Sequence, residues 1–84
     1  MKKTKLPDDA AGWEHYAGAL VKAELKMAGM RYADLQAELR KLGIDQTISN
    51  ISAKLNQGRF TAVFLMQALV AIGVETIELP RREQ

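Results

Sequence analysis

The chain contains no cysteine, and this absence removes several classes of protein. No disulfide can staple the fold, and no thiolate can bind a metal ion. The only histidine, His15, has no cysteine or second histidine near it, so the common metal sites lack their ligands. We therefore expect no metal site and no bound cofactor.

Long apolar runs are also missing. Ala62–Met66 is as long as any uninterrupted apolar run in the chain, and it is far too short to span a bilayer. The basic N-terminus "MKKTKLPDD" is not followed by the apolar segment of a secretory signal. The sequence predicts a cytoplasmic protein without a membrane partner.

The central part of the chain has no excess charge of either sign. Between residues 13 and 79, seven basic residues balance seven acidic ones, so the net charge of +2 comes from the two ends. A chain of 84 residues forms one domain at most. We expect a basic, flexible N-terminal arm over residues 1–12, a domain over residues 13–79 and a C-terminal tail over residues 80–84.

Four glycines divide the chain into runs with helical periodicity. Gly29, Gly43, Gly58 and Gly73 follow one another at spacings of 14, 15 and 15 residues, and each is placed to end a helix. The pattern predicts a compact all-α domain of four or five helices, over about residues 13–28, 32–42, 47–57 and 61–72. The segment 74–79 alternates weakly, as in a short extended strand, which would need a partner.

Apolar residues at helical spacing predict the core. The expected core residues are Trp13, Leu20, Leu35, Leu39, Ile48, Ile51, Leu55, Phe64, Leu65 and Leu69. Asp8 or Asp9 could cap the first helix or merely complement its dipole. Glu24 falls near the centre of the apolar side of that helix, and we expect its carboxylate to be paired because an unpaired charge there would be strongly penalised.

The helix expected over residues 47–57 has an unusual polar face. This face consists of short or amide side chains without a carboxylate: Gln46, Ser49, Asn50, Ala53 and Gln57. A solvated helix favours Glu, Lys and Arg, whose propensity exceeds that of Asn or Ser by up to about 0.7 kcal/mol. Amides both donate and accept hydrogen bonds, which suits adenine in a major groove. Alternatively, these residues are simply tolerated on a short helix that tertiary contacts hold in place.

The helix expected over residues 61–72 is almost entirely apolar, so one of its sides needs an extra cover. Phe64 and its neighbours on the inner side leave Val63, Met66 and Val70 together on the other side. Either the first helix covers these three residues or a second subunit does. Ile77 and Leu79, on one face of the following segment, would extend such an oligomer interface.

The order of these segments resembles the lambda-repressor-like helix-turn-helix domains. The similarity covers about residues 20–74, with "AGMRYADLQAELRKLGI" as scaffold helix, "TISNISAKLNQG" in the recognition-helix position and "FTAVFLMQALVAIGV" as packing helix. More closely, the pattern over about residues 13–79 looks like a family of short, uncharacterised bacterial domains classed near those regulators. The resemblance implies a helix-turn-helix core and suggests DNA binding.

The resemblance also implies roles for single residues. Arg31 and Tyr32 stand where those regulators often have a Ser or Thr cap and a Gln that meets a phosphate, and either could contact a phosphate. Those regulators commonly join the first helix to the end of the recognition helix by an Arg–Glu bridge. Glu24 and Lys54 would form this bridge with their signs exchanged.

Two functions from different classes follow. One is a small DNA-binding, transcription-regulator-like domain, acting as a dimer on double-stranded DNA, whose amide face meets base edges. In this interpretation the residues that contact phosphates are Arg31, Tyr32, Lys54 and Arg59. The other is a module on the same scaffold that binds another protein or is purely structural, which the neutral centre favours. An enzyme is not expected, because acidic pairs such as Asp34 with Glu38 suit an exposed helix face and no Gly-rich phosphate loop is present.

Overall fold

The computed structural model describes residues 6–82, and these form four helices: α1 (Ala10–Met27), α2 (Tyr32–Lys41), α3 (Ile48–Gln57) and α4 (Ala62–Ile72). The all-α prediction is confirmed, and all four glycines that were expected at helix ends have positive φ. Of the predicted flexible ends, Met1–Lys5 and Glu83–Gln84 lie outside the described residues, whereas residues 10–12 of the predicted arm belong to α1. No helix among residues 6–82 is both long enough and apolar enough to cross a membrane.

Three of the four helices, α1, α3 and α4, begin at side chains that accept a hydrogen bond from the backbone. The Asp9 carboxylate accepts from the Gly12 N–H at 2.8 Å, so α1 begins three residues earlier than periodicity predicted. The Thr47 hydroxyl accepts from the Asn50 N–H at 2.9 Å, and the Thr61 hydroxyl accepts from the Phe64 N–H at 3.0 Å. These local bonds set the starts of α1, α3 and α4 without help from the rest of the fold.

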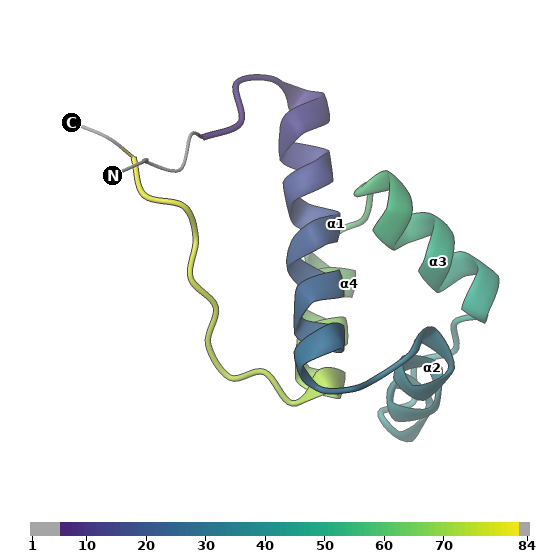
Figure 1. Cartoon of the computed structure of the whole chain (residues 1–84). Coiled ribbons are helices and arrows are strands. Elements are labelled where there is room, and N and C mark those ends of the chain that lie inside the picture. Colours follow the sequence, from purple (N-terminus) through teal and green to yellow (C-terminus); the bar gives the residue numbers. More distant parts are fainter. Residues whose placement is uncertain (1–5, 83–84) are drawn as a thin grey trace.

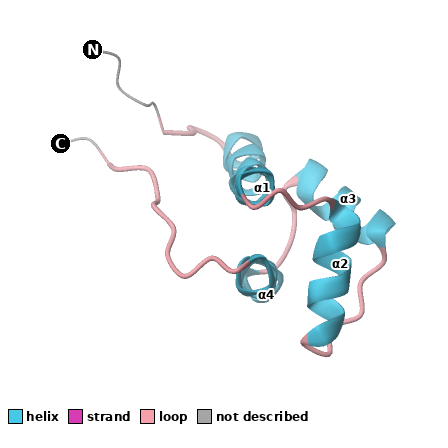
Figure 2. Ribbon diagram, turned by 60° about the horizontal axis from the view of Figure 1, so that its bottom comes forward, coloured by secondary structure: helices cyan, strands magenta, loops and turns pink. Residues whose placement is uncertain are grey.

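The four helices pack with α1 and α4 side by side and with α2 and α3 together on one side of that pair (Figures 1 and 2). The buried core draws residues from all four helices: Val21, Leu25, Leu35, Leu39, Ile51, Leu55, Phe64, Ala68 and Leu69. Residues 74–82 then run as extended chain on the side of α1 and α4 that faces away from α2 and α3 (Figure 1). No strand forms among residues 6–82, because the backbone of this segment has no neighbouring strand to pair with.

Two predicted core residues are exposed, and two more, Leu20 and Leu65, are only half buried. Trp13 is 47% exposed and contacts Tyr16 edge-on, with ring centroids 6.3 Å apart, in the first turns of α1. Ile48 is 43% exposed because it is the first residue of α3. Both residues share a helix side with buried residues, but each stands near a helix end, where that side is no longer covered.

Two glycines allow a close approach between α1 and the end of α3. Gly18 is buried, and a Cβ atom there would overlap the carbonyl oxygen of Leu55. Gly58 is also buried, and a Cβ atom there would overlap the carbonyl oxygen of Glu14. Two backbones can pack this tightly only where neither residue carries a side chain. These two glycines therefore fix how far the outer face of α3 stands from α1.

Candidate nucleic-acid interface

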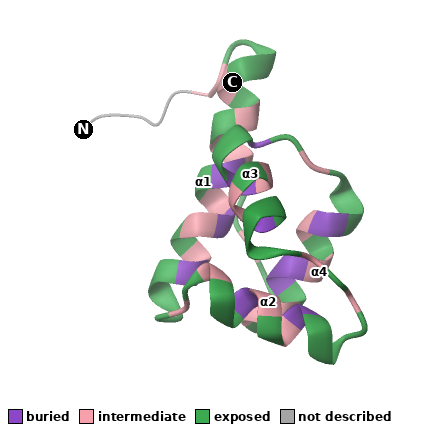
Figure 3. Ribbon diagram, turned by 90° about the vertical axis from the view of Figure 1, so that its right-hand side faces the viewer, coloured by how far each residue is buried: buried purple, intermediate pink, exposed green. Residues whose placement is uncertain are grey.

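The outer face of α3 is open to solvent. Ile51 and Leu55 are fully buried beneath it and anchor the helix to the core. The predicted base-facing residues on the helix itself all lie exposed on the opposite side: Ser49, Asn50, Ala53 and Gln57. Figure 3 shows α3 in front of α1 and α4 when the molecule is viewed from this side. The structure thus gathers the predicted amide face on one accessible surface.

Gln46 differs from the other base-facing residues because it precedes α3 and is half buried. Its backbone carbonyl oxygen accepts a hydrogen bond from the side-chain Nε2 of Gln36 at 3.0 Å. This bond ties the turn before α3 to the middle of α2. Gln46 therefore contributes to holding α2 and α3 in a fixed relation, whichever way its side chain is used.

One polar residue of α3 was missing from the predicted site. Asn56 is exposed, and its Nδ2 donates to the hydroxyl of Ser52 at 3.1 Å. The two residues are four apart, so they are neighbours along the helix surface. That spacing was visible in the sequence and could have placed Asn56 beside the amide face.

The predicted bridge between Glu24 and Lys54 is wrong. Among the described residues the ion pair that joins α1 to the end of α3 is Arg59 with Glu14, with Nε and Oε2 3.4 Å apart. Lys54 instead places its ammonium group 5.5 Å from the centroid of the Phe64 ring. Glu24 lies farther along α1, beside the end of α4, where it lines a hollow with Ile72 and Gly73. The close packing at Gly18 and Gly58 explains why Glu14, and not Glu24, lies beside the end of α3. It places the first half of α1 against the end of α3.

The phosphate-facing candidates fall into two groups. Arg59 is exposed next to the end of α3, and its pair with the half-buried Glu14 is open to solvent on the arginine side, which makes it weak. Arg31 and Tyr32 stand together at the start of α2, where the Arg31 N–H donates to the Asp34 carboxylate at 2.8 Å. Lys54 stands between these positions, held over Phe64.

A shallow hollow of about 410 Å³ brings two further cations to Arg31 and Tyr32. Lys22 and Lys26, one turn apart on α1, line it together with Arg31. Sequence reasoning assigned these lysines no role because they lie on a different helix from the amide face. Only the packing of α1 beside the start of α2 brings the three cations to one surface.

The residues predicted for an oligomer interface lie on the surface. Val63, Met66 and Val70 of α4 are 57%, 60% and 62% exposed, so α1 does not cover them. In the following segment Leu79 is exposed and Ile77 is half buried. The sequence left open whether the first helix or a second subunit covers these residues. In the described part of the chain, the first helix does not cover them.

Acidic side chains are absent from a long stretch of the sequence that contains α3. From Gln46 to Val74 the chain contains no Asp or Glu, so α3 and α4 carry no carboxylate. Across residues 6–82, no group of three or more histidine, aspartate or glutamate side chains is arranged to hold a metal ion. The α3 face itself offers amide, hydroxyl and cationic groups, and the neighbouring carboxylates, Glu14 and Asp34, come from α1 and α2.

The family DUF6471, described as a domain of unknown function, matches residues 13–77. The chain therefore belongs to the DUF6471 family. The matched residues include all of α2, α3 and α4 and most of α1, so they contain both the amide face and the Gly18–Gly58 contact. No curated protein and no solved structure matches the chain.

Proposed function

We propose that this DUF6471 domain binds double-stranded DNA as a homodimer, with α2 and α3 acting as a helix-turn-helix unit of a transcription regulator. The observation that carries the proposal is the exposed, carboxylate-free outer face of α3, whose amides match the donors and acceptors of base edges. A helix is narrow enough to enter a major groove, and the buried Ile51 and Leu55 hold this one rigidly on the core.

The cations near α3 support the same geometry. Arg59 stands at the end of α3, while Arg31 and Tyr32 stand at the start of α2 and share their surface with Lys22 and Lys26. Phosphate contacts from such groups set the register of a protein on DNA, whereas contacts to base edges specify sequence. One subunit offers few such contacts, so its binding should be weak and a useful affinity requires two half-sites.

We expect two kinds of variant to separate these roles. Asn50→Ala and Gln57→Ala should reduce discrimination between a selected sequence and random duplex by about 1–3 kcal/mol per lost base contact and leave the salt dependence unchanged. Arg59→Ala should weaken binding to all sequences alike and lower the salt slope by about one. Fluorescence anisotropy over a series of salt concentrations measures both quantities, on duplexes chosen by selection from a random pool.

Matched controls make this experiment decisive. Lys41 is exposed and forms an ion pair with Glu38 at 3.0 Å on α2, so Lys41→Ala repeats the loss of a paired surface cation away from α3. Deleting Met1–Lys5 and Arg81–Gln84 removes the basic ends. If all DNA binding disappears with the ends, or if Lys41→Ala acts like Arg59→Ala, the amide face does not read DNA.

The variant Glu14→Gln tests whether Arg59 can leave Glu14 and contact a phosphate instead. Glu14→Gln should raise the affinity for duplex by up to about fivefold, because an exposed ion pair is worth about 0–1 kcal/mol and its loss frees Arg59 for a phosphate. Glu38→Gln, which releases Lys41 in the same way, should leave the affinity almost unchanged. Equal gains for both variants would show only the general effect of removing one negative charge.

The alternative function is a protein-interaction or structural module on the same scaffold. The observation that favours it is the balance of charge over residues 13–79, since DNA-binding domains usually carry a basic surface. This alternative predicts that variants of α3 leave DNA binding unchanged, because the protein would then bind DNA only through its basic ends. The tail deletion therefore decides between the two functions.

A further inference from the structure

The exposed side of α4 is an apolar surface without charge. Val63, Met66 and Val70, which we call the α4 stripe, lie along one side of a helix that contains no charged residue. Phe64 and Ala68 turn the opposite side of α4 toward the core, so the stripe points away from α2 and α3. A cover placed on the stripe would leave the outer face of α3 free.

A groove beside the stripe can receive a side chain. Its volume is about 300 Å³, and its walls are Met66, Leu69 and Val70 on one side and the segment 74–77 on the other. The segment makes this groove only because it turns back from the end of α4 and runs close to the helix. The surface therefore combines protruding apolar side chains with a hollow of the same chemical character.

The spacing of the stripe is self-complementary. Met66 comes three residues after Val63 and four residues before Val70, so it lies near the middle of the stripe. If two copies of α4 pack antiparallel about a twofold axis near Met66, Val63 of each copy meets Val70 of the other. Val70 lines the groove, so each Val63 arrives next to the hollow in its partner.

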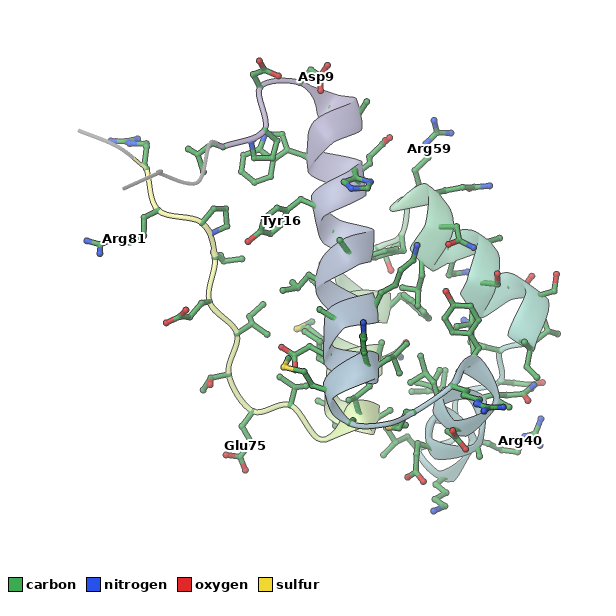
Figure 4. All side chains as sticks on the ribbon, in the orientation of Figure 1. Asp9, Tyr16, Arg40, Arg59, Glu75 and Arg81 are labelled. Carbon is green, nitrogen blue, oxygen red and sulfur yellow. The ribbon has the colours of Figure 1, made fainter. Side chains whose placement is uncertain are left out.

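The charges at the two ends of α4 favour the antiparallel arrangement. Arg59 precedes α4 and Glu75 follows it, at opposite ends of the molecule in Figure 4. Antiparallel packing brings each Arg59 toward the partner's Glu75, and it aligns the two helix dipoles favourably. Parallel packing would bring arginine toward arginine and glutamate toward glutamate, and the two helix dipoles would point in the same direction and repel each other.

We propose that the α4 stripe binds a second copy of this chain, with the two α4 helices antiparallel and Met66 near the twofold axis. The inference rests on the homodimer of the proposed function; it shares Arg59 with the proposed phosphate contacts and uses none of the proposed base contacts. Stable complexes bury roughly 800 Å² per partner, and three side chains of one helix supply only a part of such an interface, so we expect a weak dimer.

Cysteine cross-linking tests the arrangement directly, because the full chain contains no other cysteine. Met66→Cys should form a disulfide-linked dimer on mild oxidation in the absence of DNA, since facing residues at the axis approach within disulfide reach. Val63→Cys and Val70→Cys should cross-link poorly alone and efficiently when mixed, as mass spectrometry of the mixed dimer would show. Leu42→Cys, on another exposed apolar residue, is the control for random collision.

The yields distinguish every outcome. We expect about tenfold more dimer from Met66→Cys, and from the mixed pair, than from Leu42→Cys, because a bound partner raises the local concentration of the thiol. Efficient dimers from Val63→Cys alone and Val70→Cys alone would show parallel packing and overturn the arrangement. Yields equal to the control throughout, with a monomer by light scattering at high micromolar concentration, would overturn the dimer. Neither result depends on whether the domain binds DNA.

Discussion

Gly58→Ala should destabilise the domain by about 3 kcal/mol or more, which for a domain of this size approaches complete unfolding. Two costs combine at this position. Gly58 has φ of +69°, a conformation that costs a residue with a Cβ atom about 1–2 kcal/mol. In addition, the new Cβ atom would overlap the carbonyl oxygen of Glu14, so α3 would have to move away from α1. Urea unfolding followed by circular dichroism measures the loss.

Gly29 provides the matched control. It also has φ of +69°, but a Cβ atom there would meet nothing within 4 Å. Gly29→Ala should therefore cost only the conformational part, about 1–2 kcal/mol. The difference between the two variants measures the close packing of α1 against the end of α3. If both glycines cost the same, this contact contributes nothing and the close approach of the two backbones is not needed for stability.

Leu39→Ala and Phe64→Ala should each destabilise the domain by about 2–5 kcal/mol. Leu39 is fully buried on α2 and Phe64 is 3% exposed on α4, so truncation leaves a cavity that the surrounding helices can fill only in part. The same urea experiment measures the effect. The variants should also unfold in a single transition, because all four helices share one core.

Leu42→Ala is the control for this second prediction. Leu42 follows α2 directly and is 50% exposed, so the same change of side chain removes much less buried surface. We expect a loss well below that of Leu39→Ala. Losses under about 0.5 kcal/mol at both Leu39 and Phe64 would mean that the apolar periodicity does not mark the core.

Much of the local structure could be predicted from the sequence, because its signals act over a few residues. Asp9 and Thr47 each accept a hydrogen bond from a backbone N–H three residues further along the chain. Apolar spacing identified buried residues such as Leu35 and Leu39, since one side of a helix must face the core. The same spacing failed for Trp13, because periodicity shows which side faces inward but not how far along the helix the cover extends.

Self-association and base contact remain predictions, but the structure shows that the residues proposed for both are accessible. The exposed Val63, Met66 and Val70 could be read as a pattern in the sequence, yet only the position of α1 shows that it leaves them open. The amide face of α3 was likewise a pattern, and its accessibility depends on Ile51 and Leu55 turning the opposite side into the core.

The sequence by itself determined the all-α class, the approximate limits of four helices and the composition of the α3 face, because helix caps, glycines and residue spacing are local properties. The tertiary structure alone decided which groups from different helices meet. It paired Glu14 with Arg59 where Glu24 with Lys54 had been expected. The physical reason is the register of α1 against α3, which depends on the absence of two Cβ atoms, at Gly18 and Gly58, in residues 40 positions apart.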